Sequence, residues 1–526
     1  MKPITQSMKP FTQSMDRDRA AADDGKHSSA GRPAVFLPSW MLYVVCLSTM
    51  FWAVIFFLCP SSSLQLGLGN AAESYGVVQL KPPAFFSKFK MSQFGLWDKC
   101  AGRYVYMYDL PPRFNADLVR DCSNDLCKHV ANDGFGPPIT GGSGELPERG
   151  AYDTDQYMLA LIFHARMKRH ECLTSDPAAA AAVFIPFYAG LDVVRYEGLE
   201  HPDVYAMDAL PRELVEWLLE RPEWRVMGGR DHFLVVSRGS WEFLRAPGST
   251  GQGGNSLMTF PAIRNVTVLA TEASPWHGID FAVPFPSHFH ASSDADVSSW
   301  QDRMRRVERK WLWGFTGGPR GGNKRTVRSQ IFEQCGRSSR CATFGRNTRY
   351  TPGRSMQLLE SAEFCMQPRG DGYTRKSTFD SILAGCIPVF FHPVSAYLQY
   401  VWHLPRDYRS YSVFIHHGDV VSGNASIEEV LTKIPPAKVA QMREEVIRLI
   451  PTVMYRDPAA KGITFKDAFD VAVDAVIHRV EKRRQAAAEG REYQDSVDGA
   501  DSWKYDLLED GKKDIGPHEF DKYVAT

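Results

Sequence analysis

The hydrophobic pattern divides the chain into three parts, and the first part contains one long apolar segment. No charged residue occurs between Arg32 and Glu73, and residues 40–58 within that stretch are almost all apolar or aromatic. At about 1.5 Å per residue, a helix of this length spans about 29 Å, close to the hydrocarbon thickness of a bilayer. A secretory signal peptide has a shorter apolar region, about 7–15 residues, that ends at a small-residue cleavage site. We therefore predict a single transmembrane anchor over residues 34–59.

The charges on either side of this segment predict its orientation. The next basic residue after the anchor is Lys81, whereas six precede it: Lys2, Lys9, Arg17, Arg19, Lys26 and Arg32. Because positive residues are retained on the cytosolic side, we expect residues 1–33 to form a cytosolic tail and the remainder to lie in a lumen. Residues 60–97 have no sustained hydrophobic period and are expected to form a stem.

From residue 98 onward, short apolar runs alternate with segments of helical spacing. The strand-like runs are 103–109, 182–187, 232–237, 266–270, 311–315, 364–367 and 387–391. The helical segments are 155–168, 212–220, 294–310, 326–335, 355–363, 377–384, 436–449 and 465–484. This alternation predicts parallel α/β sheets. We expect one α/β domain at 98–300 and a second at 301–480, followed by a tail, 481–526, that is a candidate to pack back on the first domain.

Composition and charge narrow the possible partners and the compartment. Lys and Arg together number 61, as do Asp and Glu, and this balance argues against a nucleic-acid partner. Eight cysteines lie outside the anchor, an even number that permits disulfides in an oxidising lumen but leaves their pairing open. Asn265 and Asn424 begin Asn-X-Thr/Ser tripeptides and are the candidate N-glycosylation sites.

Two predicted strand–turn–helix segments carry groups that suit a phosphate. In the first, 311–328, a glycine-rich turn leads into a helix start with Arg325 and Arg328. Glycines let backbone N–H groups approach an anion, and a helix N-terminus attracts one. The spacing is not that of a P-loop, because Asn323 precedes Lys324 where a P-loop has glycine. A basic surface turn is the alternative interpretation.

The second segment is 361–391, in which a predicted strand ends at the sequence Arg-Gly-Asp-Gly, 369–372, and a helix follows. The hydroxyl of Thr374 and the guanidinium of Arg375 suit a diphosphate at the start of that helix. Asp380, one turn further on, would hold ribose hydroxyls.

This second segment closely resembles the C-terminal signature of the plant exostosin-like glycosyltransferases of family 47, above all the xyloglucan galactosyltransferase branch. Seven more blocks share the resemblance: 104–111, 154–166, 184–196, 230–233, 274–286, 385–393 and 502–508. The match weakens at 347–353, after Val394 and in the final tail.

The resemblance implies a GT-B fold, with two facing Rossmann-like domains behind a single N-terminal transmembrane helix. It implies a single-pass type II protein of the Golgi membrane, with a luminal catalytic domain and other Golgi glycosyltransferases as candidate partners. The implied reaction is inverting transfer of galactose from UDP-galactose to xylosyl side chains of xyloglucan, in cell-wall polysaccharide synthesis. It needs no cofactor and no essential metal. The domain at 98–300 would bind the acceptor and that at 301–480 the nucleotide sugar.

The resemblance also implies roles for individual residues at the positions that match the family's motifs. The donor site would consist of Arg325, Arg328, Arg369, Gly370, Asp371, Thr374, Arg375 and Asp380. An inverting transferase needs a base on the acceptor hydroxyl, which we expect from the N-terminal domain. Asp280, with His277 beside it, is the first candidate and Asp192 the second, although such carboxylates also cap turns.

Other polar pairs have plainer interpretations. The Asp-x-Asp pairs at 153–155 and 294–296 resemble the manganese-binding motif of the other major transferase fold, but each stands before a predicted helix, where Asp commonly serves as N-cap. His288 and His290 alternate on one face with no third ligand nearby, so packing or acceptor contact is expected. We therefore predict no metal site.

Two other functions remain open from the sequence. A related galacturonosyltransferase would use UDP-galacturonic acid, and the choice would depend on whether a basic residue faces C6 of the sugar. A non-catalytic, sugar-binding scaffold subunit of a polysaccharide synthase complex is a different class. The intact donor block argues against the scaffold.

Overall fold

The computed structural model describes residues 98–123, 125–139, 146–147, 149–199, 202–245, 254–274, 279–318, 325–344, 350–491 and 493. The predicted cytosolic tail, anchor and stem lie outside these residues. Within the described ranges, no helix is long and apolar enough to cross a bilayer.

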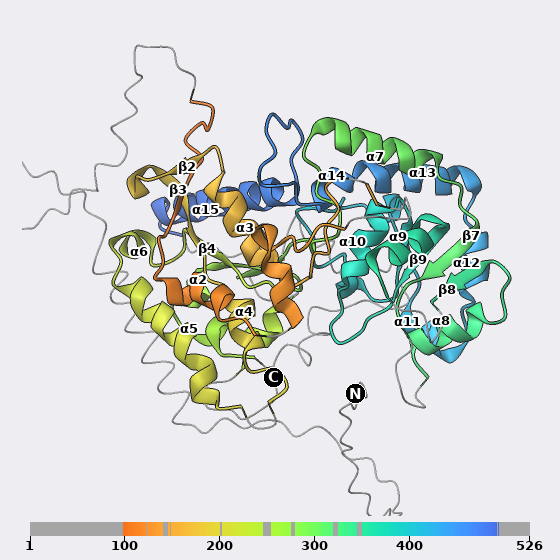
Figure 1. Cartoon of the computed structure of the whole chain (residues 1–526), viewed down its shortest axis with the longest axis horizontal. Coiled ribbons are helices and arrows are strands. Elements are labelled where there is room, and N and C mark those ends of the chain that lie inside the picture. Colours follow the sequence, from red (N-terminus) through yellow and green to blue (C-terminus); the bar gives the residue numbers. More distant parts are fainter. Residues whose placement is uncertain are drawn as a thin grey trace, which may run out of the picture. The chain divides into compact units, whose positions relative to one another are not determined.

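Six parallel strands form the first sheet, in the order β2-β1-β3-β4-β5-β6 (Figure 1). They are β1 (Tyr104–Met107), β2 (Leu173–Thr174), β3 (Ala180–Ile185), β4 (His232–Val235), β5 (Thr267–Ala270) and β6 (Asp280–Ala282). The three central strands, β3 to β5, are buried at every position, as expected for a parallel sheet with helices on both faces. The helices of this half include α2 (Ala116–Arg120), α3 (Leu159–Lys168), α4 (Ala189–Val194), α5 (Val204–Leu219) and α6 (Pro222–Met227).

Five parallel strands form the second sheet, in the order β11-β10-β9-β7-β8. They are β7 (Trp311–Phe315), β8 (Cys341–Thr343), β9 (Ala362–Gln367), β10 (Ile387–Phe390) and β11 (Val413–Phe414). The helices of this half are α7 (Asp294–Arg306), α8 (Val327–Cys335), α9 (Pro352–Glu360), α10 (Lys376–Leu383), α11 (His417–Ser422), α12 (Ile427–Thr432), α13 (Pro436–Arg448) and α14 (Ile450–Val453).

The strand order of the second sheet reverses at one point. β8 lies on one side of β7, whereas β9, β10 and β11 follow on the other side. In open α/β sheets, ligands bind outside the carboxyl ends of the strands at such a reversal. The topology therefore places a ligand site at the ends of β7 and β9.

Each sheet has its own hydrophobic core, and the chain passes between them twice. Most buried apolar residues from 285 to 454 belong to the second core, whereas those of 105–270 and again of 455–480 belong mainly to the first. We predicted that the second domain would run to residue 480. The return begins at Tyr455 instead, because the apolar face of α15 (Ala468–Ala488) is buried in the first core beside β3 (Figure 1).

Polar contacts join the two halves next to the ligand-binding end of the second sheet. The backbone N–H and the hydroxyl of Thr374 both donate to Oε2 of Glu272, at 2.7 Å each. The side-chain amide of Gln399 exchanges two hydrogen bonds with the backbone of Ala273, at 2.7 and 2.8 Å. The loop after β5 is thus fixed to the segment that precedes α10.

The cysteine pairing that the sequence left open is settled by four disulfides. They join Cys100 to Cys172, Cys122 to Cys127, Cys335 to Cys341 and Cys365 to Cys386. All eight cysteines outside the predicted anchor are therefore paired.

Candidate active site

A cavity of about 700 Å³ opens where the strand order of the second sheet reverses. Thr316, Gly317 and Gly318 line it directly after β7, and Pro368 lines it directly after β9. The opposite wall comes from the first half and from His288, which lies in the segment between β6 and α7. The first half contributes Lys128, His129, Asp153, Thr154, Asp155 and Gln156. The cavity thus lies between the two halves, at the position that the topology indicates.

Three helices of the second half begin at this cavity. Arg328 belongs to the first turn of α8, Ser355 to the start of α9, and Lys376 and Ser377 to the first turn of α10. Thr326 and Thr351 cap α8 and α9 with their side chains, whereas Arg375 at the N-cap of α10 makes no such bond. The first N–H groups of α10 are therefore suited to an anion.

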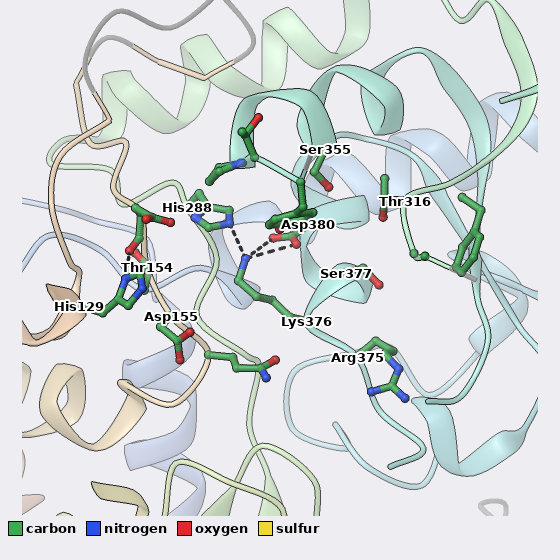
Figure 2. A pocket seen from close by; sticks show the side chains of 18 of the residues that line it. His129, Thr154, Asp155, His288, Thr316, Ser355, Arg375, Lys376, Ser377 and Asp380 are labelled. Atoms are coloured by element: carbon green, nitrogen blue, oxygen red, sulfur yellow. Dashed lines mark hydrogen bonds and ion pairs between the residues drawn. The ribbon is translucent and has the colours of Figure 1, made fainter. Parts of the chain in front are cut away.

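Lys376 forms the centre of a buried polar cluster (Figure 2). Its Nζ donates to Nε2 of His288 at 2.8 Å and lies 3.1 and 3.3 Å from the two carboxylate oxygens of Asp380. The hydroxyl of Ser287 donates to the same carboxylate. Ser287 and His288 lie in the segment between β6 and α7, and His288 is hydrogen-bonded to the backbone of Tyr152 in the first half, so the cluster also joins the two halves.

The charge states within this cluster follow from its contacts. Burial is the largest single influence and lowers the pKa of Lys376, but Asp380, Tyr350 and Asp155 together outweigh burial, so the pKa lies above its usual value. Burial and the neighbouring Lys376 lower the pKa of His288 to about 4. Neutral His288 can therefore accept a hydrogen bond from Lys376 at Nε2, while its Nδ1 donates a hydrogen bond to the backbone carbonyl of Tyr152 at 3.0 Å.

Two Asp side chains stand on the opposite wall. Oδ1 of Asp155 accepts the backbone N–H of Tyr157 at 2.8 Å, and Oδ2 of Asp153 lies 3.5 Å from Nζ of Lys128. We predicted this pair to cap a helix. However, α3 begins later, with Met158 at its N-cap, so neither carboxylate is its cap.

The second Asp-x-Asp pair also differs from its prediction. Ser293 is the N-cap of α7, and its hydroxyl accepts the N–H of Asp296. Asp294 and Asp296 belong to the first turn, where Asp294 accepts bonds from Thr464. Carboxylates in the first turn of a helix still interact favourably with the helix dipole.

Three of the predicted donor-site residues line the cavity, namely Arg328, Arg375 and Asp380. Asp380 is engaged by Lys376 and Ser287, so it holds the lysine in place rather than offering an open carboxylate to a ribose.

The other five predicted donor residues are not among the cavity-lining residues. Thr374 is bonded to Glu272, and Arg325 donates to Gln330 at 3.2 Å. Arg369 is exposed and lies over the ring of Tyr373, and Asp371 is also exposed. At Gly370, a Cβ would lie 1.4 Å from the guanidinium of Arg375, so this glycine makes room for a cavity residue.

The predicted bases also lie away from the cavity wall. Asp280 is buried at the amino end of β6 and accepts the N–H of Ser274 at 2.7 Å. Asp192 is buried in α4, where Arg195 and Asn255 donate to its carboxylate. Burial raises the pKa of Asp192 to about 6. His277 lies outside the described residues.

The remaining predicted sites concern sugars and metals. Asn424 is exposed in the turn between α11 and α12, whereas the amide of Asn265 is half-buried and donates to the carbonyl of Gly228 at 2.8 Å. Among the residues described, no group of three His, Cys, Asp or Glu side chains is placed to hold a metal ion. The metal-free donor site stays a prediction.

Sequence reasoning overlooked Lys376, assigned Asp155 to a helix cap and assigned His288 only to packing or acceptor contact. A signal for Lys376 existed, because Lys376 directly precedes the predicted helix 377–384 and lies four residues before Asp380, the spacing at which two helical residues share a face. Asp155 and His288 meet the cavity only through the packing of the two halves, which local spacing does not encode.

Comparison with known proteins agrees with this architecture. The exostosin GT47 domain matches residues 99–431. Xyloglucan galactosyltransferase MUR3 of Arabidopsis thaliana is 46% identical over 465 residues, which cover 85% of this chain and 75% of the relative. Xyloglucan-specific galacturonosyltransferase 1 of the same plant is 38% identical and covers 73% of this chain and 58% of the relative.

A solved structure, Arabidopsis thaliana UGT89C1 complexed with UDP, is 12% identical at a TM-score of 0.27 and covers 61% of this chain and 96% of that one. A likeness this weak carries no weight. The family match and the identity to MUR3 over most of the chain do: this chain belongs to the exostosin GT47 family of glycosyltransferases.

Proposed function

We propose that this protein is an inverting galactosyltransferase that moves galactose from UDP-galactose to xylosyl side chains of xyloglucan. The observation that carries the proposal is the cavity between two parallel-sheet halves, with helix N-termini, Arg328, Arg375 and Lys376 on one wall and Asp153 and Asp155 on the other. MUR3, a relative with 46% identity, is named a xyloglucan galactosyltransferase, and this supports the choice of sugar and acceptor. Two doubly wound halves facing one cavity suit the GT-B arrangement.

The second half would bind the donor. A UDP diphosphate at the N-terminus of α10 would meet its first N–H groups and the side chains of Arg328, Arg375 and Lys376. These groups would offset the charge that develops on the diphosphate as it leaves. The acceptor would enter from the side of the first half.

Location and modification are part of the same proposal. An anchor at 34–59 and six basic residues before it support a type II protein of the Golgi membrane, with residues after the anchor in the lumen. Exposed Asn424 is the better-placed glycosylation site of the two. Other Golgi glycosyltransferases are the proposed protein partners.

Galacturonic acid is the second candidate sugar, because a relative that is 38% identical is named a galacturonosyltransferase. The two donors differ at C6, where galacturonate carries an extra negative charge. A cation that contacts C6 would favour galacturonate. With galactose bound, the same cation would be buried without a partner, which would disfavour galactose.

The experiment incubates the purified full-length chain with xyloglucan oligosaccharides and either UDP-galactose or UDP-galacturonate, with and without EDTA. Transfer of β-linked galactose that persists in EDTA is expected. Transfer from UDP-galacturonate alone would support the second candidate. A folded protein that transfers neither sugar would contradict both and favour the scaffold.

A further inference from the structure

The direction of an inverting displacement limits where the base can be. The acceptor oxygen attacks the anomeric carbon from the face opposite the leaving diphosphate. The groups suited to the diphosphate, Arg328, Arg375 and Lys376, all belong to the second half. The proton acceptor must therefore come from the opposite wall.

Four side chains on that wall carry a basic atom: His129, Asp153, Asp155 and His288. Nε2 of His288 already accepts a hydrogen bond from Lys376 at 2.8 Å, and burial lowers the pKa of this imidazole. The carboxylate of Asp153 is already engaged in an ion pair, because its Oδ2 lies 3.5 Å from Nζ of Lys128. Asp155 and His129 remain.

The contacts of Asp155 favour it over His129. Its Oδ1 is oriented by the N–H of Tyr157, while its Oδ2 makes no hydrogen bond to any of the residues described. The Asp155 carboxylate is also one of the groups that raise the pKa of Lys376, so the two charges lie within electrostatic reach across the cavity. Asp155 is only half-buried, whereas the His129 ring is nearly fully buried against Asp153.

Figure 2 shows the resulting arrangement around Lys376. Asp155 and His129 lie on one side of the lysine, and Arg375 and Ser377 lie on the other. A sugar held between Lys376 and Asp155 would have its leaving group toward the cations and its opposite face toward the carboxylate.

We propose that Asp155 is the general base of the transfer, an inference that rests on the proposed function. Oδ2 of Asp155 takes the proton of the acceptor hydroxyl as that oxygen forms a bond to C1 of the donor sugar. The bond between C1 and the β-phosphate oxygen breaks, and its electron pair leaves with UDP. The neutral carboxyl group then returns its proton to water.

Asp155→Asn removes the basic oxygen but keeps the bond to Tyr157. General-base catalysis contributes about 10²–10⁴ in rate, so we expect kcat to fall at least about 100-fold with the affinity for UDP, measured by calorimetry, unchanged. The acid limb of the pH profile of kcat/KM should disappear with it. Asp133→Asn is the matched control, because Asp133 is an exposed partner of Arg169 in the same half and should retain full activity.

Rescue separates a base from a structural residue. Azide is an anionic nucleophile that needs no base, so Asp155→Ala supplied with azide should form β-galactosyl azide, while the unaltered chain gains little. A variant that keeps more than about a tenth of kcat, or that loses UDP affinity together with kcat, overturns the assignment. So does His129→Gln if it abolishes turnover while Asp155→Asn does not. No transfer by the unaltered chain overturns the proposed function itself, and the base with it.

Discussion

At the scale of single residues, the ion pair of Lys376 and Asp380 links donor binding to stability. Asp380 is buried and Lys376 is largely buried, and Asp380 has no other cation within the contacts described. Lys376→Met should raise the KM for the donor at least about tenfold, because a charge beside the diphosphate is lost. It should also lower the free energy of unfolding by about 3 kcal/mol, because a buried carboxylate is left unpaired.

The double variant Lys376→Met/Asp380→Asn is the control for this prediction. Removing the unpaired charge should restore most of the unfolding free energy, measured in urea, without restoring donor affinity. If the double variant also recovers its donor KM, the lysine acts only by neutralising Asp380 and does not contact the donor.

The residue scale also shows what sequence reasoning can and cannot find. Arg328 and Arg375 were predicted from glycine turns and helix starts, which are local features, and both line the cavity. Thr374 had the same local signal, yet its hydroxyl and N–H are used by Glu272, 102 residues away. Spacing reveals which groups stand at a helix start but not which of them a distant segment has already engaged.

At the scale of elements, the turn between β9 and α10 determines the position of Arg375. Gly370→Ala would place a Cβ where the Arg375 guanidinium now lies, 1.4 Å from Nη2. We expect the arginine to be displaced and the donor KM to rise about fivefold to tenfold, with the melting temperature nearly unchanged because the turn is partly exposed. Gly336→Ala at the end of α8 is the control, since its Cβ would meet only ordinary contacts from 3.4 Å.

Disulfides connect elements with very different loop lengths. Cys100 and Cys172 join β1 and β2 across 72 residues, whereas Cys122 and Cys127 are 5 residues apart. Loop-closure entropy gives about 4 kcal/mol for the longer loop and about 2 kcal/mol for the shorter one. Replacing each pair by serines should lower the unfolding free energy in that ratio in urea titrations. Equal losses would mean that local packing, not chain entropy, dominates.

The elements that the sequence predicted and those it missed differ in length. Runs of four or more buried apolar residues predicted β3, β4, β5, β7, β9 and β10 to within a few residues. The missed strands, β2, β6, β8 and β11, have two or three residues each, too few to show a period. All four are edge strands, formed because a neighbouring strand offers its hydrogen-bonding groups.

At the scale of the whole molecule, burial of ionisable groups links stability to pH. Burial lowers the pKa of five histidines from 6.5 to about 3 or about 4: His164, His288, His290, His392 and His403. Near pH 5 each is neutral when folded and protonated when unfolded, so unfolding takes up protons. Two buried carboxyls act in the opposite sense, because burial raises the pKa of Asp192 and Asp470 and each releases a proton on unfolding.

Five protons taken up and two released leave a net uptake of about three, so stability must fall as pH falls from about 6.5 toward 4. The slope near pH 5 should be about 4 kcal/mol per pH unit. Urea titrations between pH 6.5 and 5, with proton uptake measured by calorimetry in two buffers, test this directly. Replacing exposed His478 by Gln should leave the slope unchanged, whereas His403→Gln should reduce it by about a third. A flat or rising stability on acidification would mean that these histidines stay accessible to protons in the folded state.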